Sequence, residues 1–97
     1  MTAAELLAKP ENWCQKAFAM DGDGKTVPLE SATACRFCLT GSLFKVYTDG
    51  FGPAWDKVVA TLGSVYGTSD AQNLAHWNDN PKRTHAEVLA LLKKAGV

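Results

Sequence analysis

Apolar side chains recur at helical spacing through much of the chain. The clearest stripe has steps of three or four residues, which is the repeat of one helical face. It lies between Pro53, which suits the first turn of a helix, and Gly67, which suits the position after the last turn. The pattern predicts a helix there, with a buried face made of Trp55, Val58, Val59, Leu62 and Tyr66.

A similar stripe follows Thr84 and consists of Val88, Leu89, Leu91, Leu92 and Ala95. Thr84 and Glu87 have the spacing of a capping box, in which each side chain bonds the other residue's amide. Lys93 and Lys94 suit the negative end of the helix dipole, and Gly96 suits the terminating cap. Leu74 and Trp77 predict a shorter helix before this one, capped by Ser69 or Asp70.

The first half of the chain predicts two more helices. Thr2-Ala-Ala-Glu5 is another capping box, so a short helix is expected to run to about Lys9, where Pro10 discourages its continuation. From Ser31 to about Tyr47 the apolar stripe comprises Cys35, Cys38, Leu39, Ser42, Leu43 and Val46. Gly41 lies inside this stretch, which predicts close packing against a neighbouring element.

The segment from Trp13 to Val27 is ambiguous between a strand and a helix. Its Asp-Gly-Asp-Gly stretch at 21–24 is a turn signal, and Lys25 to Val27 can return as a strand. We therefore expect a mainly α fold, a compact orthogonal bundle of about five short helices, with a small β-hairpin near residues 16–28 as an open alternative. Three tryptophans, at 13, 55 and 77, are expected to anchor its core.

Length, composition and charge agree with one small globular domain over residues 1–97. The chain is 46% hydrophobic, and ten basic residues balance ten acidic ones. This neutral, dispersed charge argues against a nucleic-acid partner. We see no secretory signal and no apolar run of about 20 residues, so no membrane association is expected. Three cysteines, an odd number, favour free thiols and a cytoplasmic location.

Residues 19–26 superficially match two ligand-binding loops. A phosphate loop requires a helix after its lysine, and Pro28 opposes a helix that begins at Lys25. A calcium loop that starts at Asp21 requires an oxygen ligand where Lys25 stands and a glutamate where Ala32 stands. Both patterns fail, so a plain turn is the better interpretation and no cofactor is expected.

A Cys-x-x-Cys pair makes the best metal candidate. Zinc favours thiolate and imidazole ligands, and a weak alternative site consists of Cys14, Cys35, Cys38 and His76, with His85 as the other possible histidine. Against this, the pair falls on the apolar stripe of a predicted helix, and free cysteine is among the most buried residue types. Buried thiols are therefore the favoured interpretation. A cysteine–histidine catalytic dyad requires one of the cysteines to lie within hydrogen-bonding distance of a histidine, and the sequence does not show whether this is so.

The loop that follows the predicted short helix is the most polar part of the chain. Its candidate binding residues are Trp77, Asn78, Asp79, Arg83 and Thr84. The plainer interpretation is that Asp79 pairs with Arg83, Asn78 ends a helix and Thr84 caps the next one. The plainer interpretation of the two histidines, in place of a catalytic dyad, is that His85 faces solvent and His76 is half-buried beside Trp77.

The order of several motifs resembles a family of small bacterial and phage proteins of unknown function. The motifs are Trp13-Cys14-Gln15, Phe37-Cys38-x-x-Gly41, Trp77-Asn78-Asp79 and Arg83-Thr84-x-x-Glu87-Val88. The resemblance extends from about Ala4 to Ala95 and implies a bacterial or phage cytoplasm. Members often have glycine at the position of Lys16 and alanine at that of Ser42. The resemblance supplies no activity and no catalytic residue.

Three functional hypotheses follow from the sequence. The leading one is a non-enzymatic accessory or interaction module with a protein partner, itself a monomer or weak homodimer. The second is a small zinc-binding domain that uses the three cysteines and a histidine. The third is a small enzyme at the 77–84 loop, with Asp79 as acid or base and Arg83 as an anion clamp.

Overall fold

The computed structural model describes residues 1–67 and 73–97. In these ranges the chain forms five α-helices, two short helical turns of other types and a two-stranded antiparallel sheet. The helices are α1 (Ala3–Leu6), α2 (Leu39–Val46), α3 (Phe51–Thr61), α4 (Leu74–Asp79) and α5 (His85–Ala95). The remaining elements are η1 (Pro10–Asn12), η2 (Leu62–Tyr66), β1 (Ala19–Met20) and β2 (Arg36–Phe37). The predicted mainly α fold is confirmed.

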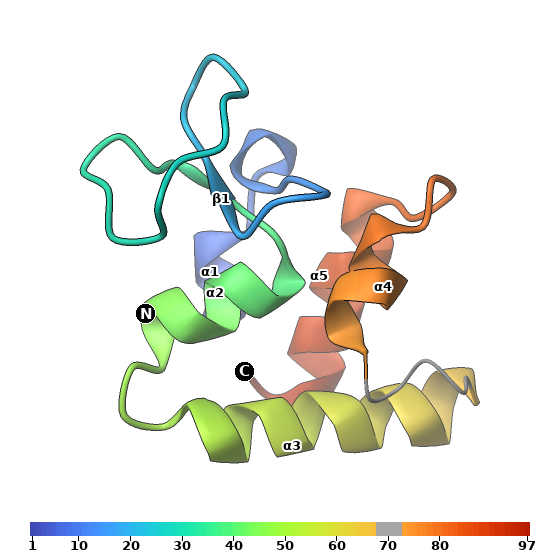
Figure 1. Cartoon of the computed structure of the whole chain (residues 1–97). Helices are drawn as coiled ribbons and strands as arrows, with labels where there is room; N and C mark the ends of the chain where they lie inside the picture. The colour runs from blue at the N-terminus through green and yellow to red at the C-terminus, as the bar shows by residue number, and fades with distance from the viewer. Residues whose placement is uncertain (68–72) are drawn as a thin grey trace.

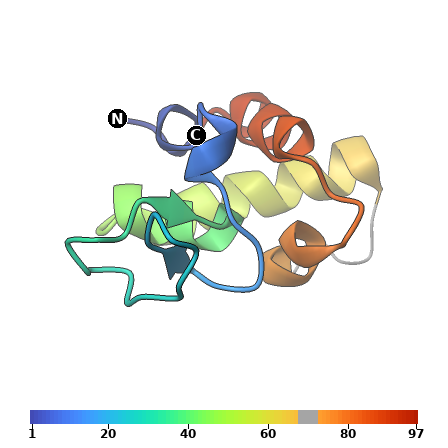
Figure 2. The same ribbon diagram turned by 90° about the horizontal axis from the view of Figure 1, so that it is seen from above.

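The longest helical segment, α3 with η2, runs along one side of the molecule, and the other elements lie across it (Figure 1). Helix α3 packs against α2 and α5, while α4 packs against α2. The sheet and its loops lie on the side of α2 that faces away from α3 (Figure 1), so from above they overlap part of the helices (Figure 2). The two termini are adjacent, since the Ala4 amide donates to the Val97 carbonyl over 3.3 Å.

Leucine and valine side chains from every helix meet in one hydrophobic cluster. Its fully buried large members are Leu7, Leu39, Leu43, Val58, Leu62, Leu74, Val88, Leu91 and Leu92. Of the three tryptophans, Trp77 is buried, whereas Trp13 and Trp55 are half-buried and pack against the cluster. No helix within the described ranges is both long and apolar enough to cross a bilayer.

Both capping boxes form as the sequence predicts. Thr2 pairs with Glu5 at the start of α1, and Thr84 pairs with Glu87 at the start of α5. Helix α5 ends at Gly96 with a left-handed φ of 77°, a conformation that glycine adopts without steric cost. These caps form as predicted because the bonds they make join near neighbours in sequence.

The predicted extent of two helices is wrong. Helix α1 ends at Leu6 rather than near Lys9. The predicted helix from Ser31 is replaced by turns and β2 up to Phe37, and α2 begins at Leu39 with Cys38 as its cap. The physical reason is that Phe37 is buried through pairing with extended chain, and its carbonyl accepts from the Cys14 amide over 3.1 Å. Pairing with residues distant in sequence therefore gives this segment an extended conformation, although its apolar spacing is that of a helix.

The ambiguous segment forms a sheet, but its partner differs from the one expected. Strand β1 pairs antiparallel with β2, so that Ala19 faces Phe37. A tight turn over residues 21–24 returns the chain, and Met20 forms an isolated bridge with Thr26. The expected hairpin near residues 16–28 is thus reduced to the single bridge between Met20 and Thr26. The main partner of β1 is β2, which pairs with its other edge.

Helix α4 begins at Leu74. Ser69 and Asp70, the expected caps, lie outside the described residues. The cap of α4 is Asn73, whose side chain accepts from the His76 amide over 3.0 Å. The predicted helix with Leu74 and Trp77 is confirmed, and both of these side chains are buried.

Gly41 is packed closely, as its place inside a predicted helix indicates. A Cβ atom at this position would collide with the carbonyl oxygen of Phe18. The same carbonyl accepts from the Cys38 amide over 3.3 Å. The absence of a side chain at Gly41 therefore lets the segment before β1 lie directly on α2, which sets the position of Phe18.

Candidate functional site

Asn78 joins three distant parts of the chain. It is fully buried, and its Oδ1 accepts from Trp13 Nε1 over 2.7 Å and from the Leu39 amide over 3.1 Å. Its Nδ2 donates to the Cys14 carbonyl over 3.2 Å and to Asp79 Oδ1 over 3.0 Å. All four hydrogen-bonding positions of the amide are filled. Asn78 therefore holds α4 against the N-terminal segment, and its side chain is not exposed on the surface.

Asp79 fixes an unusual backbone conformation next to that amide. Its Oδ1 accepts from the backbone nitrogen of Lys16 over 2.8 Å, as well as from Asn78. Lys16 has a φ of 68°, in the left-handed region that residues with a side chain seldom adopt. The second carboxylate oxygen of Asp79, Oδ2, accepts no hydrogen bond in the part of the chain that the structure describes.

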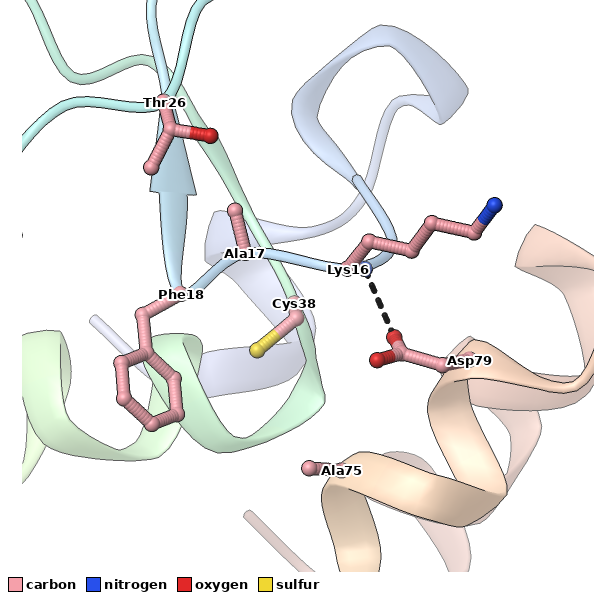
Figure 3. Close-up of a pocket in the computed structure, with 7 residues that line it drawn as sticks. All are labelled: Lys16, Ala17, Phe18, Thr26, Cys38, Ala75 and Asp79. Carbon is pink, nitrogen blue, oxygen red and sulfur yellow. Dashed lines mark hydrogen bonds between the residues drawn. The ribbon is translucent and has the colours of Figure 1, made fainter.

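A pocket of about 360 Å³ lies between this turn, α2 and α4. Its lining residues are Lys16, Ala17, Phe18, Thr26, Cys38, Ala75 and Asp79. In Figure 3 the Phe18 ring stands at one side and Asp79 at the opposite side, with one carboxylate oxygen bonded to Lys16 and the other directed toward the cavity. The ammonium of Lys16 points away from the cavity in the same view. The pocket is thus an apolar cavity with one carboxylate oxygen at its wall.

The two buried thiols near the pocket are poor nucleophiles. Burial raises the pKa of Cys14 to about 12, with a further contribution from Cys38. Burial also raises the pKa of Cys38, although the Gly41 amide, which donates to its sulfur over 3.2 Å, acts in the opposite direction. Both thiols stay protonated at neutral pH, and a protonated thiol neither attacks a substrate nor binds a metal well.

The described part of the chain does not bring the proposed zinc ligands together. Cys35 is exposed, whereas Cys14 and Cys38 are buried, so the prediction that both members of the Cys-x-x-Cys pair lie in the core is wrong for Cys35. Residues 1–67 and 73–97 contain no cluster of three or more metal-ligating side chains. His76 is exposed on α4 rather than half-buried. His85 is half-buried, not solvent-facing, and its Nε2 lies 2.6 Å from the Leu7 carbonyl.

Arg83 contacts Trp77 and Glu87. Its Nε donates to the Trp77 carbonyl over 3.0 Å, and its guanidinium carbon lies 3.8 Å from the centre of the Trp77 ring. Its Nη1 bonds Glu87 over 3.2 Å. The expected pairing of Arg83 with Asp79 is therefore wrong. Of the five candidate residues at 77–84, Asp79 alone lines this pocket.

A strip of aromatic side chains borders the pocket, and the sequence analysis missed it. The rings of Phe44 and Phe51 are stacked, with centroids 4.0 Å apart, and Phe18 meets Phe44 edge-on at 6.2 Å. Trp55 continues the strip at 5.5 Å from Phe51. Phe18 is 53% exposed and Phe44 is 41% exposed. We call Phe18, Phe44, Phe51 and Trp55 the aromatic strip. The signal in the sequence was Phe44, an aromatic residue out of phase with the buried stripe of α2.

Comparison with protein families identifies the chain. A model described as "Family of unknown function (DUF6197)" matches residues 1–96. The chain belongs to this family. No curated protein and no solved structure matches the DUF6197 chain. Any function must therefore be argued from the site itself, since membership of a family without a known activity carries none.

Proposed function

We propose that this DUF6197 chain is a non-catalytic interaction module that binds a protein partner. The observation that carries the proposal is the aromatic strip, which is exposed at Phe18 and Phe44 and continuous with a pocket. Aromatic residues are enriched in protein interfaces because they bury a large area at a small cost in conformational entropy. Phe18 belongs to both the strip and the pocket, so one partner segment can cover both.

The chemistry around the pocket supports binding more than catalysis. Its one buried thiol, Cys38, has a raised pKa, and the arginine that was considered as an anion clamp is held against Trp77. Asp79 is half-buried and engaged with the backbone of Lys16. An acid–base catalyst acts together with a nucleophile or an oxyanion donor. Among the described lining residues the candidate nucleophiles are the protonated Cys38 thiol and the Thr26 hydroxyl, and Asp79 is hydrogen-bonded to neither. This favours the interaction module over the small enzyme.

The proposal treats residues 1–97 as one domain that acts in the cytoplasm and is a monomer until its partner binds. Neutral net charge makes long-range attraction to a strongly charged partner weak. Specificity then depends on local shape and on the single carboxylate in the pocket. We expect a modest affinity, in the micromolar range of about −8 kcal/mol, because the strip and pocket are small compared with obligate interfaces.

A peptide library displayed on phage and selected on the immobilised chain tests the proposal. We expect enriched peptides to bind the wild-type chain in solution, and to bind a Phe44→Ser variant at least about 10-fold more weakly. The matched control is Val65→Ser, because Val65 is also exposed, at 49%, but lies in η2, outside the strip. It should bind the same peptides as the wild type does.

Two results would contradict the proposal. One is a selection that enriches no peptide, or peptides whose affinity is equal for the wild type and Phe44→Ser. The other is a concentration-dependent dimer, seen by light scattering after size-exclusion chromatography, that Phe44→Ser abolishes. That dimer would show that a second copy of the chain covers the strip, in place of a different partner.

A further inference from the structure

We infer that the pocket beside the aromatic strip binds the side chain of a lysine from the partner. The inference rests on the proposed function and names the chemistry of one contact within it. The pocket combines apolar walls, from Ala17, Phe18 and Ala75, with a carboxylate at Asp79. A long apolar stem that ends in a positive charge matches this combination, since the stem contacts the walls and the charge meets the carboxylate.

The hydrogen bonds of Asp79 favour an ammonium over a guanidinium. Oδ1 already accepts from Lys16 and Asn78, so Oδ2 is the oxygen left for a ligand. Arginine recognises carboxylates best with two parallel bonds to two oxygens, and that geometry is not available here. An ammonium is a compact charge that is satisfied by one oxygen. The site therefore selects lysine over arginine.

The neighbouring side chains leave this oxygen accessible. In Figure 3 the Lys16 ammonium is directed outward, and the Cys38 sulfur faces the cavity without a charge. Phe18, on the side opposite Asp79, adds an aromatic ring to the apolar wall that the lysine stem contacts. A bound lysine thus places its ammonium at the Asp79 oxygen and its stem against the apolar walls, a combination that neither an acidic nor a neutral side chain would match.

The partner segment follows from the same geometry. Phe18 is shared between the pocket and the strip, so a lysine in the pocket places the adjacent residues of its chain over Phe18 and Phe44. Those neighbours are expected to be apolar. The sequence pattern we expect in a partner is a lysine with an aliphatic or aromatic residue within one or two positions.

Titration of the ¹⁵N-labelled chain with small lysine analogues tests the inference without a known partner. The probes are the N-acetyl methylamides of lysine, arginine, norleucine and citrulline. We expect saturable shifts of the Lys16 and Phe18 amide signals with the lysine probe at millimolar concentrations, weaker shifts with arginine, and none with the two neutral probes. Equal shifts with lysine and norleucine would overturn the inference, and so would the absence of shifts.

Two variants and a control make the test specific. Asp79→Asn keeps an oxygen for Lys16 but removes the charge, and should weaken lysine binding about 10-fold or more. Ala75→Leu keeps the charge of Asp79 but fills the cavity, so it should also weaken lysine binding. This second variant keeps the inference testable if Asp79→Asn does not fold. Asp56→Asn, at an exposed position of α3, should bind lysine normally. Normal binding by either pocket variant, when folded, would overturn the inference.

This outcome is separable from that of the proposed function. If selected peptides bind through Phe44 but contain no preference for lysine, and the lysine probe gives no shifts, the interaction module stands and the pocket assignment is wrong. If the lysine probe binds but no peptide depends on Phe44, the pocket assignment stands and the strip has no part in recognition.

Discussion

The indole nitrogen of Trp13 donates to the side-chain oxygen of Asn78 over 2.7 Å, which joins two residues 65 positions apart in the chain. The same oxygen accepts from the amide of Leu39 at the start of α2. One amide side chain thus ties the N-terminal segment, α2 and α4 together. The pocket lies beside this junction, so its shape depends on a buried polar network that is fully satisfied.

Asn78→Ala is expected to destabilise the chain by about 3 kcal/mol or more, because it leaves the Leu39 amide and the Trp13 indole without an acceptor. Urea denaturation followed by circular dichroism measures the change. Trp13→Phe is a milder comparison, because it removes one donor and leaves the amide of Asn78 with three bonds. If Asn78→Ala were no less stable than Trp13→Phe, the network would not have the role described.

Lys16→Gly is expected to stabilise the chain by up to about 1 kcal/mol. Lys16 has a φ of 68°, and glycine relieves the steric cost of the left-handed region, although it also gains freedom in the unfolded state. Thermal unfolding would show a higher Tm. Lys25→Gly is the matched control, since Lys25 has no positive φ and should lose stability or stay unchanged.

Gly41→Ala is expected to destabilise the chain by about 1–3 kcal/mol, because the added methyl group overlaps the Phe18 carbonyl. It should also shift the Phe18 amide signal, since the segment before β1 must move. Gly63→Ala is the control at a helical position with open space around it, where alanine should be neutral or stabilising. Equal effects at the two positions would contradict the close approach of residue 18 to α2.

Cysteine alkylation is expected to distinguish the three thiols. Iodoacetamide at about pH 8 should label Cys35 first, because it is exposed, while Cys14 and Cys38 react after unfolding. Mass spectrometry of tryptic peptides over time gives the order. Rapid labelling of Cys14 in the folded chain would contradict its burial.

Stability is expected to fall at alkaline pH partly through the same thiols. The pKa of Cys14 is raised to about 12 in the folded chain, whereas an unfolded thiol titrates near pH 8.5. The unfolded state therefore loses its proton first, so the stabilising effect is complete below about pH 8.5 and is lost as the pH rises toward 12. A Cys14→Ala variant should show a shallower decline in unfolding free energy between pH 9 and 10.5 than the wild type. Parallel declines would refute the assignment.

Arg83→Met is expected to destabilise the chain by about 1–3 kcal/mol. It keeps an apolar stem over Trp77 but removes the charge above the ring and the bond to the Trp77 carbonyl. Lys82→Met is the neighbouring control, because Lys82 is exposed. The peptide affinity of Arg83→Met should remain at the wild-type level, since Arg83 does not line the pocket. A loss of affinity without loss of stability would restore Arg83 as a binding residue.

The sequence by itself determined the elements whose evidence is local. The capping boxes at Thr2 and Thr84 and the left-handed cap at Gly96 depend on bonds within a few residues. The helical period of α3 was also visible, although Tyr66 at the end of the predicted stripe is exposed. The tight packing at Gly41 was also predictable from the sequence. Glycine lowers the stability of a helix interior, so its presence there indicates a close contact that leaves no room for a side chain.

Tertiary structure decided everything that depends on contacts between distant residues. The three- and four-residue steps around Cys35 suggested a helix, yet Phe37 is extended because it pairs with Cys14 and Ala19. Asn78 looked like a loop residue and is the centre of the core network, since its four partners come from three separate segments. The pocket exists because a left-handed turn at Lys16 brings Phe18 opposite Asp79, and no local pattern encodes that distance.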